Sequence, residues 1–154
     1  MIRTKGRLRL CAALLICNLI FIWGNSLLPA SISAQISGAL KAFLDGLLPR
    51  GGDSTVSSGD GLLRKLAHFA EFGALGLLLF WLFGMLGKRW PAPFALGVAA
   101  ACVDETIQIF VPGRGPGIRD VCIDSCGVAA GMLLLLLGHA CLRKRSTRNN
   151  FRRK

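Results

Sequence analysis

Four long apolar runs are the feature that most constrains this chain. They cover residues 8–28, 62–86, 92–111 and 118–142. A bilayer core about 30 Å thick is crossed by about 20 helical residues, so each run is long enough to span a membrane. Hydrophobic residues make up 53% of the chain, which agrees with that reading. The sequence therefore predicts an all-α membrane protein, a single domain of residues 1–154 with four transmembrane helices.

The basic residues predict how these helices are oriented. They gather before the first run at residues 3–9, in the turn at Lys88 and Arg89, and in the tail at residues 143–154, whereas the acids lie in the other loops or within the runs. Lysine and arginine are retained on the cytoplasmic side of a membrane. We therefore predict a multi-pass protein of the inner, or plasma, membrane with both termini and the basic tail in the cytoplasm.

The net charge of +11 does not by itself indicate a nucleic-acid partner. Retention of basic residues on the cytoplasmic side of the membrane, and their attraction to anionic lipids, account for the positive charge. We expect membrane lipids as partners and no nucleic acid. The six cysteines lack any CxxC spacing, and a Cys122 and Cys126 metal pair is a minor alternative.

A second kind of helix is predicted directly after the first span. Between residues 31 and 48, apolar side chains such as Ile32, Ile36, Leu40 and Phe43 recur at helical spacing. The remaining positions are mostly small or polar. We expect a short amphipathic helix that lies on the outer membrane surface rather than crossing it.

Ionisable side chains occur at similar depths in three of the four spans. Lys65, His68 and Glu71 share one side of the second span at spacings i, i+3 and i+6. At a rise of about 1.5 Å per residue, His68 lies roughly 9 Å inside its span, Asp104 roughly 10 Å and Asp124 roughly 9 Å. A carboxylate facing lipid costs about 2.5–3.5 kcal/mol. The side chains should therefore face one another and form a polar pocket open to the outside.

Small residues continue the same helix faces deeper into the membrane. Gly97 and Ala101 precede Asp104 and Gln108 on one face of the third span, and Gly127 and Gly131 follow Asp120 and Asp124 on the fourth. A GxxxG pair lets helix backbones approach closely. Because the two spans are antiparallel, we expect these small-residue faces to pack against each other.

These segments resemble the VanZ-like family of small bacterial membrane proteins. The resemblance is carried by KLAHFAEFGALGLLLF and by DETIQIFVPGRGPGIRDVCIDSCGVAAG, and it extends to Asn25, Ser26 and Pro29 after the first helix. Phe72 stands where the family often has tyrosine, and Asp124 stands where asparagine is common. The founding member is associated with resistance to the glycopeptide teicoplanin. The resemblance thus implies a cell-envelope protein with a role in antibiotic resistance, without implying a reaction.

The first functional hypothesis is binding at the outer leaflet, with no cofactor expected. The ligand would be a lipid-linked envelope precursor or an amphiphilic antibiotic such as a glycopeptide. Arg114 and Arg119 could grip a phosphate or carboxylate in forked geometry, unless they only close the loop by salt bridges to Asp120 or Glu105. The pocket would be formed by Lys65, His68, Glu71, Asp104, Glu105, Gln108, Arg114, Arg119, Asp120 and Asp124.

The second hypothesis is a metal-dependent hydrolase or transferase acting on a lipid-linked phosphate. His68, Glu71, Asp104 and Asp120 are the ligands it would use for a divalent ion, with Asp124 also acceptable and Glu105 as a base. Against it, His68 and Glu71 could simply form a buried hydrogen-bonded pair. A third hypothesis, a polar core that only fixes helix register, also remains, and the oligomeric state stays open.

Overall fold

The chain folds entirely into helices over the part that the structure describes. The computed structural model describes residues 2–47, 59–88, 90–115 and 117–151. The helices, in order, are α1 (Ile2–Ser26), α2 (Ala30–Leu47), α3 (Gly59–Met85), α4 (Ala92–Ile109) and α5 (Ile118–Phe151). Four of them are long and apolar enough to cross a membrane, over Lys5–Ser26, Gly61–Met85, Ala92–Ile109 and Ile118–Lys144. The predicted all-α class, with four spans and a short helix after the first, is confirmed.

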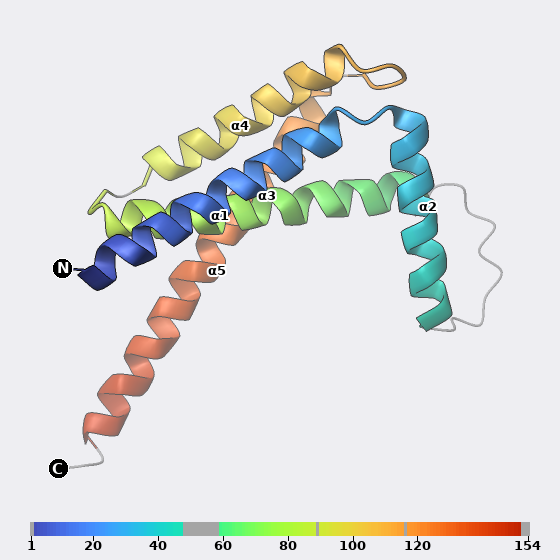
Figure 1. Ribbon diagram of the computed structural model, residues 1–154. Helices are drawn as coiled ribbons and strands as arrows, with labels where there is room; N and C mark the ends of the chain where they lie inside the picture. The colour runs from blue at the N-terminus through green and yellow to red at the C-terminus, as the bar shows by residue number, and fades with distance from the viewer. Residues whose placement is uncertain (1, 48–58, 89, 116, 152–154) are drawn as a thin grey trace.

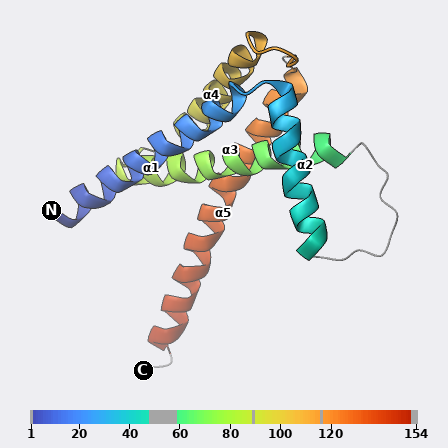
Figure 2. The ribbon, with the colours of Figure 1, turned by 45° about the vertical axis from the view of Figure 1, so that its right-hand side comes forward.

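Helix α3 is the centre of the arrangement and contacts each of the other four helices. Figure 1 shows α1 and α4 running beside it, while α2 runs across the start of α3. Helix α5 crosses α3 and then continues away from the other helices, as the turned view in Figure 2 also shows. The link between α1 and α2, the start of α3 and the loop between α4 and α5 all gather at one end of the bundle.

A short turn after α4 fixes the loop at that end. The Arg114 amide donates a hydrogen bond to the carbonyl oxygen of Val111 at 3.1 Å, which closes the turn. Between them Gly113 has φ +76°, a conformation that favours glycine. A Cβ at Gly113 would also lie 3.1 Å from the Cβ of Ala30, so α2 begins against this loop. The Ala30 amide donates to the Pro112 carbonyl oxygen at 3.4 Å.

The closest helix contact is that between α3 and α5. A Cβ on Gly127 would overlap the carbonyl oxygen of Phe69, and one on Gly131 would overlap that of Gly73. The GxxxG pair therefore packs on α3, not on the small-residue face of α4 as the sequence suggested. Gly97 of α4 does meet α5, where its Cβ would lie 2.5 Å from Val128 Cγ1. Three helices thus approach around Val128.

Apolar side chains fill the interior and also cover the outside of the spans. The buried cluster comprises Ile22, Phe72, Leu75, Leu79, Ala100, Ala101, Val128 and Met132. Large apolar side chains on the outer faces, such as Ile20, Phe21, Leu134 and Leu137, are exposed, as expected where lipid is the solvent. On α2, Ile32, Ile36, Leu40 and Phe43 are exposed as well. Its position on the membrane surface stays a prediction.

Candidate functional site

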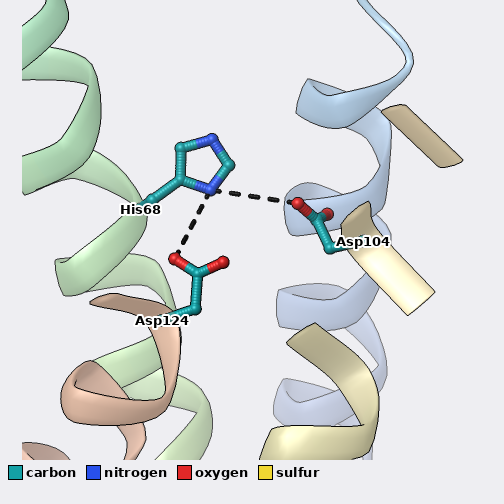
Figure 3. A group of neighbouring side chains, drawn as sticks. All are labelled: His68, Asp104 and Asp124. Carbon is teal, nitrogen blue, oxygen red and sulfur yellow. Dashed lines mark ion pairs between the residues drawn. The ribbon is translucent and has the colours of Figure 1, made fainter. Parts of the chain in front are cut away.

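Three side chains from three helices meet near the end of the bundle where α3 begins. His68 of α3 lies between Asp104 of α4 and Asp124 of α5, with its Nδ1 atom 4.0 Å from Asp104 Oδ2 and 3.8 Å from Asp124 Oδ1. Figure 3 shows the imidazole ring turned toward both carboxylates. These are ion-pairing distances, longer than a hydrogen bond. The matching depths of the three spans predicted this meeting.

Gln108 orients the Asp104 carboxylate from one turn further along α4. Its Nε2 atom donates hydrogen bonds to Asp104 Oδ2 at 2.9 Å and to Ser26 Oγ at 3.4 Å. Its Oε1 atom accepts from Arg64 Nη2 at 3.4 Å. Gln108 is only 1% exposed, and its hydrogen bonds join α1, α3 and α4. The Asp104 carboxylate is thereby fixed in its orientation toward His68.

Glu71 pairs with α1 rather than with His68. Its Oε1 atom accepts a hydrogen bond from Asn25 Nδ2 at 3.1 Å. The backbone oxygen of Asn25 in turn accepts from Arg114 Nη2 at 3.1 Å. The alternative of a buried hydrogen-bonded His68 and Glu71 pair is therefore wrong. The end of α1 instead joins Glu71 to the loop after α4.

A cavity of about 250 Å³ opens above the three-residue cluster. Its lining combines basic, acidic and small residues, namely Gly61, Arg64, Lys65, His68, Glu105, Gln108, Gly113, Arg114, Gly115, Asp120, Ile123 and Asp124. Glu105 is buried and accepts a hydrogen bond from the Gly117 amide at 2.8 Å, which ties the loop to α4. Most of the predicted pocket residues thus line one cavity.

Three predicted pocket residues lie outside the lining. Asp104 is fully buried beneath the cavity, and Glu71 lies to one side in contact with α1. Arg119 is exposed at the start of α5. The predicted packing residues Gly97, Ala101, Gly127 and Gly131 are all buried.

Arg114 faces the cavity with most of its hydrogen-bonding capacity free. Its Nε and Nη1 atoms are buried and have no hydrogen-bond partner among the described residues. Burial lowers the pKa of the Arg114 guanidinium from its ordinary value, although arginine remains charged in proteins. No ion pair joins Arg114 or Arg119 to Asp120 or Glu105 in the described part of the chain. The arginines therefore do not merely close the loop by salt bridges.

The cluster beneath the cavity has the composition of a metal site. His68, Asp104 and Asp124 each offer one ligand atom, and these atoms all lie within 4.8 Å of one another. The set differs from the predicted ligands, because Asp124 takes the place of Glu71 and Asp120. Asp104 Oδ1 and both carboxylate oxygens of Asp124 are buried without hydrogen-bond partners among the described residues.

Sequence reasoning missed Arg64 as a cavity residue. It lies four residues before His68 and hence on the same helix face, so its position could have been read from the helical period. Asn25 and Ser26 were noted only as part of the resemblance. Their hydrogen bonds to Glu71 and Gln108 depend on how α1 is rotated, which no spacing on α1 alone reveals.

The comparison with known proteins decides the family. A model of the VanZ/LLP1 family matches residues 10–139. The chain belongs to the VanZ/LLP1 family. Together with the four apolar helices, the VanZ/LLP1 match makes this a multi-pass membrane protein. No curated protein and no solved structure matches the chain. The matched segment contains every residue of the cavity and the cluster beneath it.

Proposed function

We propose that this VanZ-like protein binds the anionic headgroup of an amphiphilic cell-envelope molecule in the cavity at the end of its bundle. The single observation that carries the proposal is Arg114, which lines the cavity while two of its guanidinium nitrogens are buried without partners. A buried donor without an acceptor costs about 1–3 kcal/mol, and more when it is charged. A phosphate or carboxylate bound in the cavity would remove that cost once the guanidinium turns toward it.

The other basic residues that line the cavity support the binding of an anionic group with several oxygen atoms. Arg64 and Lys65 line the same cavity from α3, and Gly113 and Gly115 leave the loop backbone open to a ligand. Arginine binds phosphate and carboxylate with two parallel hydrogen bonds, while lysine acts as a point charge. Glu105 and Asp120 lie across the cavity and favour a headgroup that also carries hydroxyl or amine donors.

An apolar groove deeper in the bundle suits the hydrocarbon part of the ligand. A second cavity of about 300 Å³ is bounded by α1, α3 and α4 and lined by Leu15, Leu19, Trp23, Leu75, Leu79, Leu96, Ala99, Ala100 and Val103. Ala100 lies one helical turn before Asp104. A polar cavity together with an apolar groove in the same bundle favours an amphiphile over a small soluble anion.

The proposed biological setting rests on the predicted orientation and on the family. With the termini in the cytoplasm, the headgroup cavity opens on the outer side of the plasma membrane, where lipid-linked envelope precursors of bacteria are exposed. Binding such a precursor, or a glycopeptide antibiotic itself, is the route by which a protein of this kind would contribute to resistance.

Equilibrium binding of a polyprenyl phosphate to the full chain in detergent tests the proposal. Replacing Arg114 by glutamine removes charged hydrogen bonds worth about 1.5–3 kcal/mol, so the dissociation constant should rise about 10–100-fold. The matched control is Arg119→Gln, which removes an exposed arginine outside the cavity and should leave the constant unchanged. Equal losses in the two variants would contradict a specific headgroup site. A glycopeptide titrated in parallel identifies the ligand class.

A further inference from the structure

Two buried carboxylates in this membrane protein lie close together without an ion pair to any lysine or arginine of the described residues. Asp104 is 0% exposed and Asp124 is 1% exposed. Neither has a lysine or arginine within ion-pairing distance among the described residues, and His68 is their shared neighbour. Both oxygens of Asp124 and one of Asp104 lack hydrogen-bond donors. Burying carboxylates in this way costs several kcal/mol per charge unless a cation compensates them.

We propose that His68, Asp104 and Asp124 together bind one divalent transition-metal ion, such as Zn²⁺ or Mn²⁺. One imidazole nitrogen and two carboxylates form a donor set that suits these ions. A divalent cation neutralises both carboxylates and fills the lone pairs that no donor reaches. The unpartnered Asp124 side chain, directed at His68, distinguishes this cluster from an ordinary group of acids.

The distances fit an ion with little rearrangement. Metal–ligand bonds of about 2.1 Å place two ligands of one ion at most about 4.2 Å apart. The two distances from His68 Nδ1, at 4.0 Å and 3.8 Å, already lie within that limit. The whole set lies within 4.8 Å, so carboxylate movements of about half an ångström close the site.

The residues around the cluster suit a bound metal ion that also contacts a ligand in the cavity. The Gln108 amide donates to Asp104 Oδ2 at 2.9 Å and holds this carboxylate as an outer-shell partner does. His68 and Asp124 line the cavity, so coordination positions that the protein does not fill face the proposed headgroup site. Metal binding itself does not require the headgroup, and the two proposals can therefore fail separately.

Metal titration of the purified full chain without added lipid tests the site. After chelator treatment, the wild-type protein should bind one Zn²⁺ or Mn²⁺ per chain, as counted by elemental analysis and calorimetry. His68→Gln, Asp104→Asn and Asp124→Asn should each weaken binding by more than about 100-fold, because even outer-shell changes cost about 10–100-fold. Gln108→Ala should weaken metal binding by about 10–100-fold, as expected for a residue that holds a metal ligand in place.

The control is Asp120→Asn, which removes an acid from the same cavity but outside the cluster. It should weaken ion binding less than Asp124→Asn does, because Asp120 acts on the cluster only through its charge and supplies no ligand atom. Equal weakening in Asp120→Asn and Asp124→Asn, or a wild-type chain that binds no ion, overturns the proposal. The second result would mean that protons neutralise the carboxylates instead.

X-ray absorption on the zinc-loaded wild type gives a test that needs no variant to fold. The spectrum should show nitrogen and oxygen neighbours at about 2.0–2.2 Å. Free cysteines are present, and Cys122 and Cys126 are both exposed on α5. A sulfur shell at about 2.3 Å would assign the ion to cysteines and overturn the site.

Discussion

Replacing Gly127 by alanine should separate α3 from α5 and weaken both the fold and the cluster. The new Cβ would overlap the carbonyl oxygen of Phe69, and it would lie 3.2 Å from that residue's carbonyl carbon and 3.3 Å from the Gly73 nitrogen. All three atoms belong to backbone, so no side chain can move aside. The helices must part by about 1 Å to restore ordinary contact distances.

The cost follows from the contacts that this separation weakens. A gap of about 1 Å forfeits about half of each dispersion contact, and each is worth about 0.1–0.2 kcal/mol. For about 40 atom pairs across the α3 and α5 contact, the loss is about 3 kcal/mol, at the upper end of the usual cost of overpacking. The same movement would lengthen the 3.8 Å separation between His68 and Asp124 past the limit of about 4.2 Å for two ligands of one ion, so ion binding would need a further carboxylate movement and should weaken.

Unfolding in detergent, followed by the loss of helical circular dichroism, measures the first effect. The matched control is Gly138→Ala on the same helix, where a Cβ meets nothing within 4 Å. Its effect should not exceed about 1 kcal/mol. If Gly127→Ala unfolds with the same free energy as Gly138→Ala, the close approach of α3 and α5 does not stabilise the protein, and the packing argument is refuted.

Three further predictions concern topology, the α1 contact and α2. In a chain freed of its native cysteines, a membrane-impermeant reagent should label Arg119→Cys from outside and miss Lys88→Cys; the reverse would invert the orientation. Asn25→Ala removes the hydrogen bond to the half-buried Glu71 carboxylate and should cost about 1 kcal/mol in detergent unfolding. Asn18→Ala, which removes an oxygen that has no partner among the described residues, should cost less. A peptide of residues 30–47 should bind lipid vesicles, and Phe43→Ser should weaken its partitioning about tenfold or more, because Phe43 is 64% exposed on α2; equal partitioning would argue against a surface helix.

The meeting of His68, Asp104 and Asp124 was predictable because a helix rises by a constant amount per residue. Once the spans were assigned from their apolar length, counting from the helix ends placed all three at one depth. The cost of a carboxylate in lipid then required them to face inward. Neither step needs knowledge of which helices are neighbours.

The residues that contact each other between helices were less predictable, because those contacts do require knowing which helices are neighbours. The spacing of Gly127 and Gly131 indicates a close helix approach, but it does not say whether α3 or α4 is the partner. Glu71 lies on the same side of α3 as His68, yet its carboxylate accepts a hydrogen bond from the Asn25 side-chain amide of α1. Such pairings depend on helix rotation and crossing, which the sequence of one helix does not determine.

The central claim is that the cavity beside Arg114 recognises a negatively charged headgroup on an amphiphile. Native mass spectrometry of the full chain, offered equal amounts of a polyprenyl phosphate and the corresponding uncharged polyprenol, tests it most directly. One polyprenyl phosphate should remain bound per chain in preference to the alcohol, and this preference should fall about 10–100-fold in Arg114→Gln. Equal retention of the two lipids by the wild type would show that the hydrocarbon chain alone is bound, and it would contradict the claim.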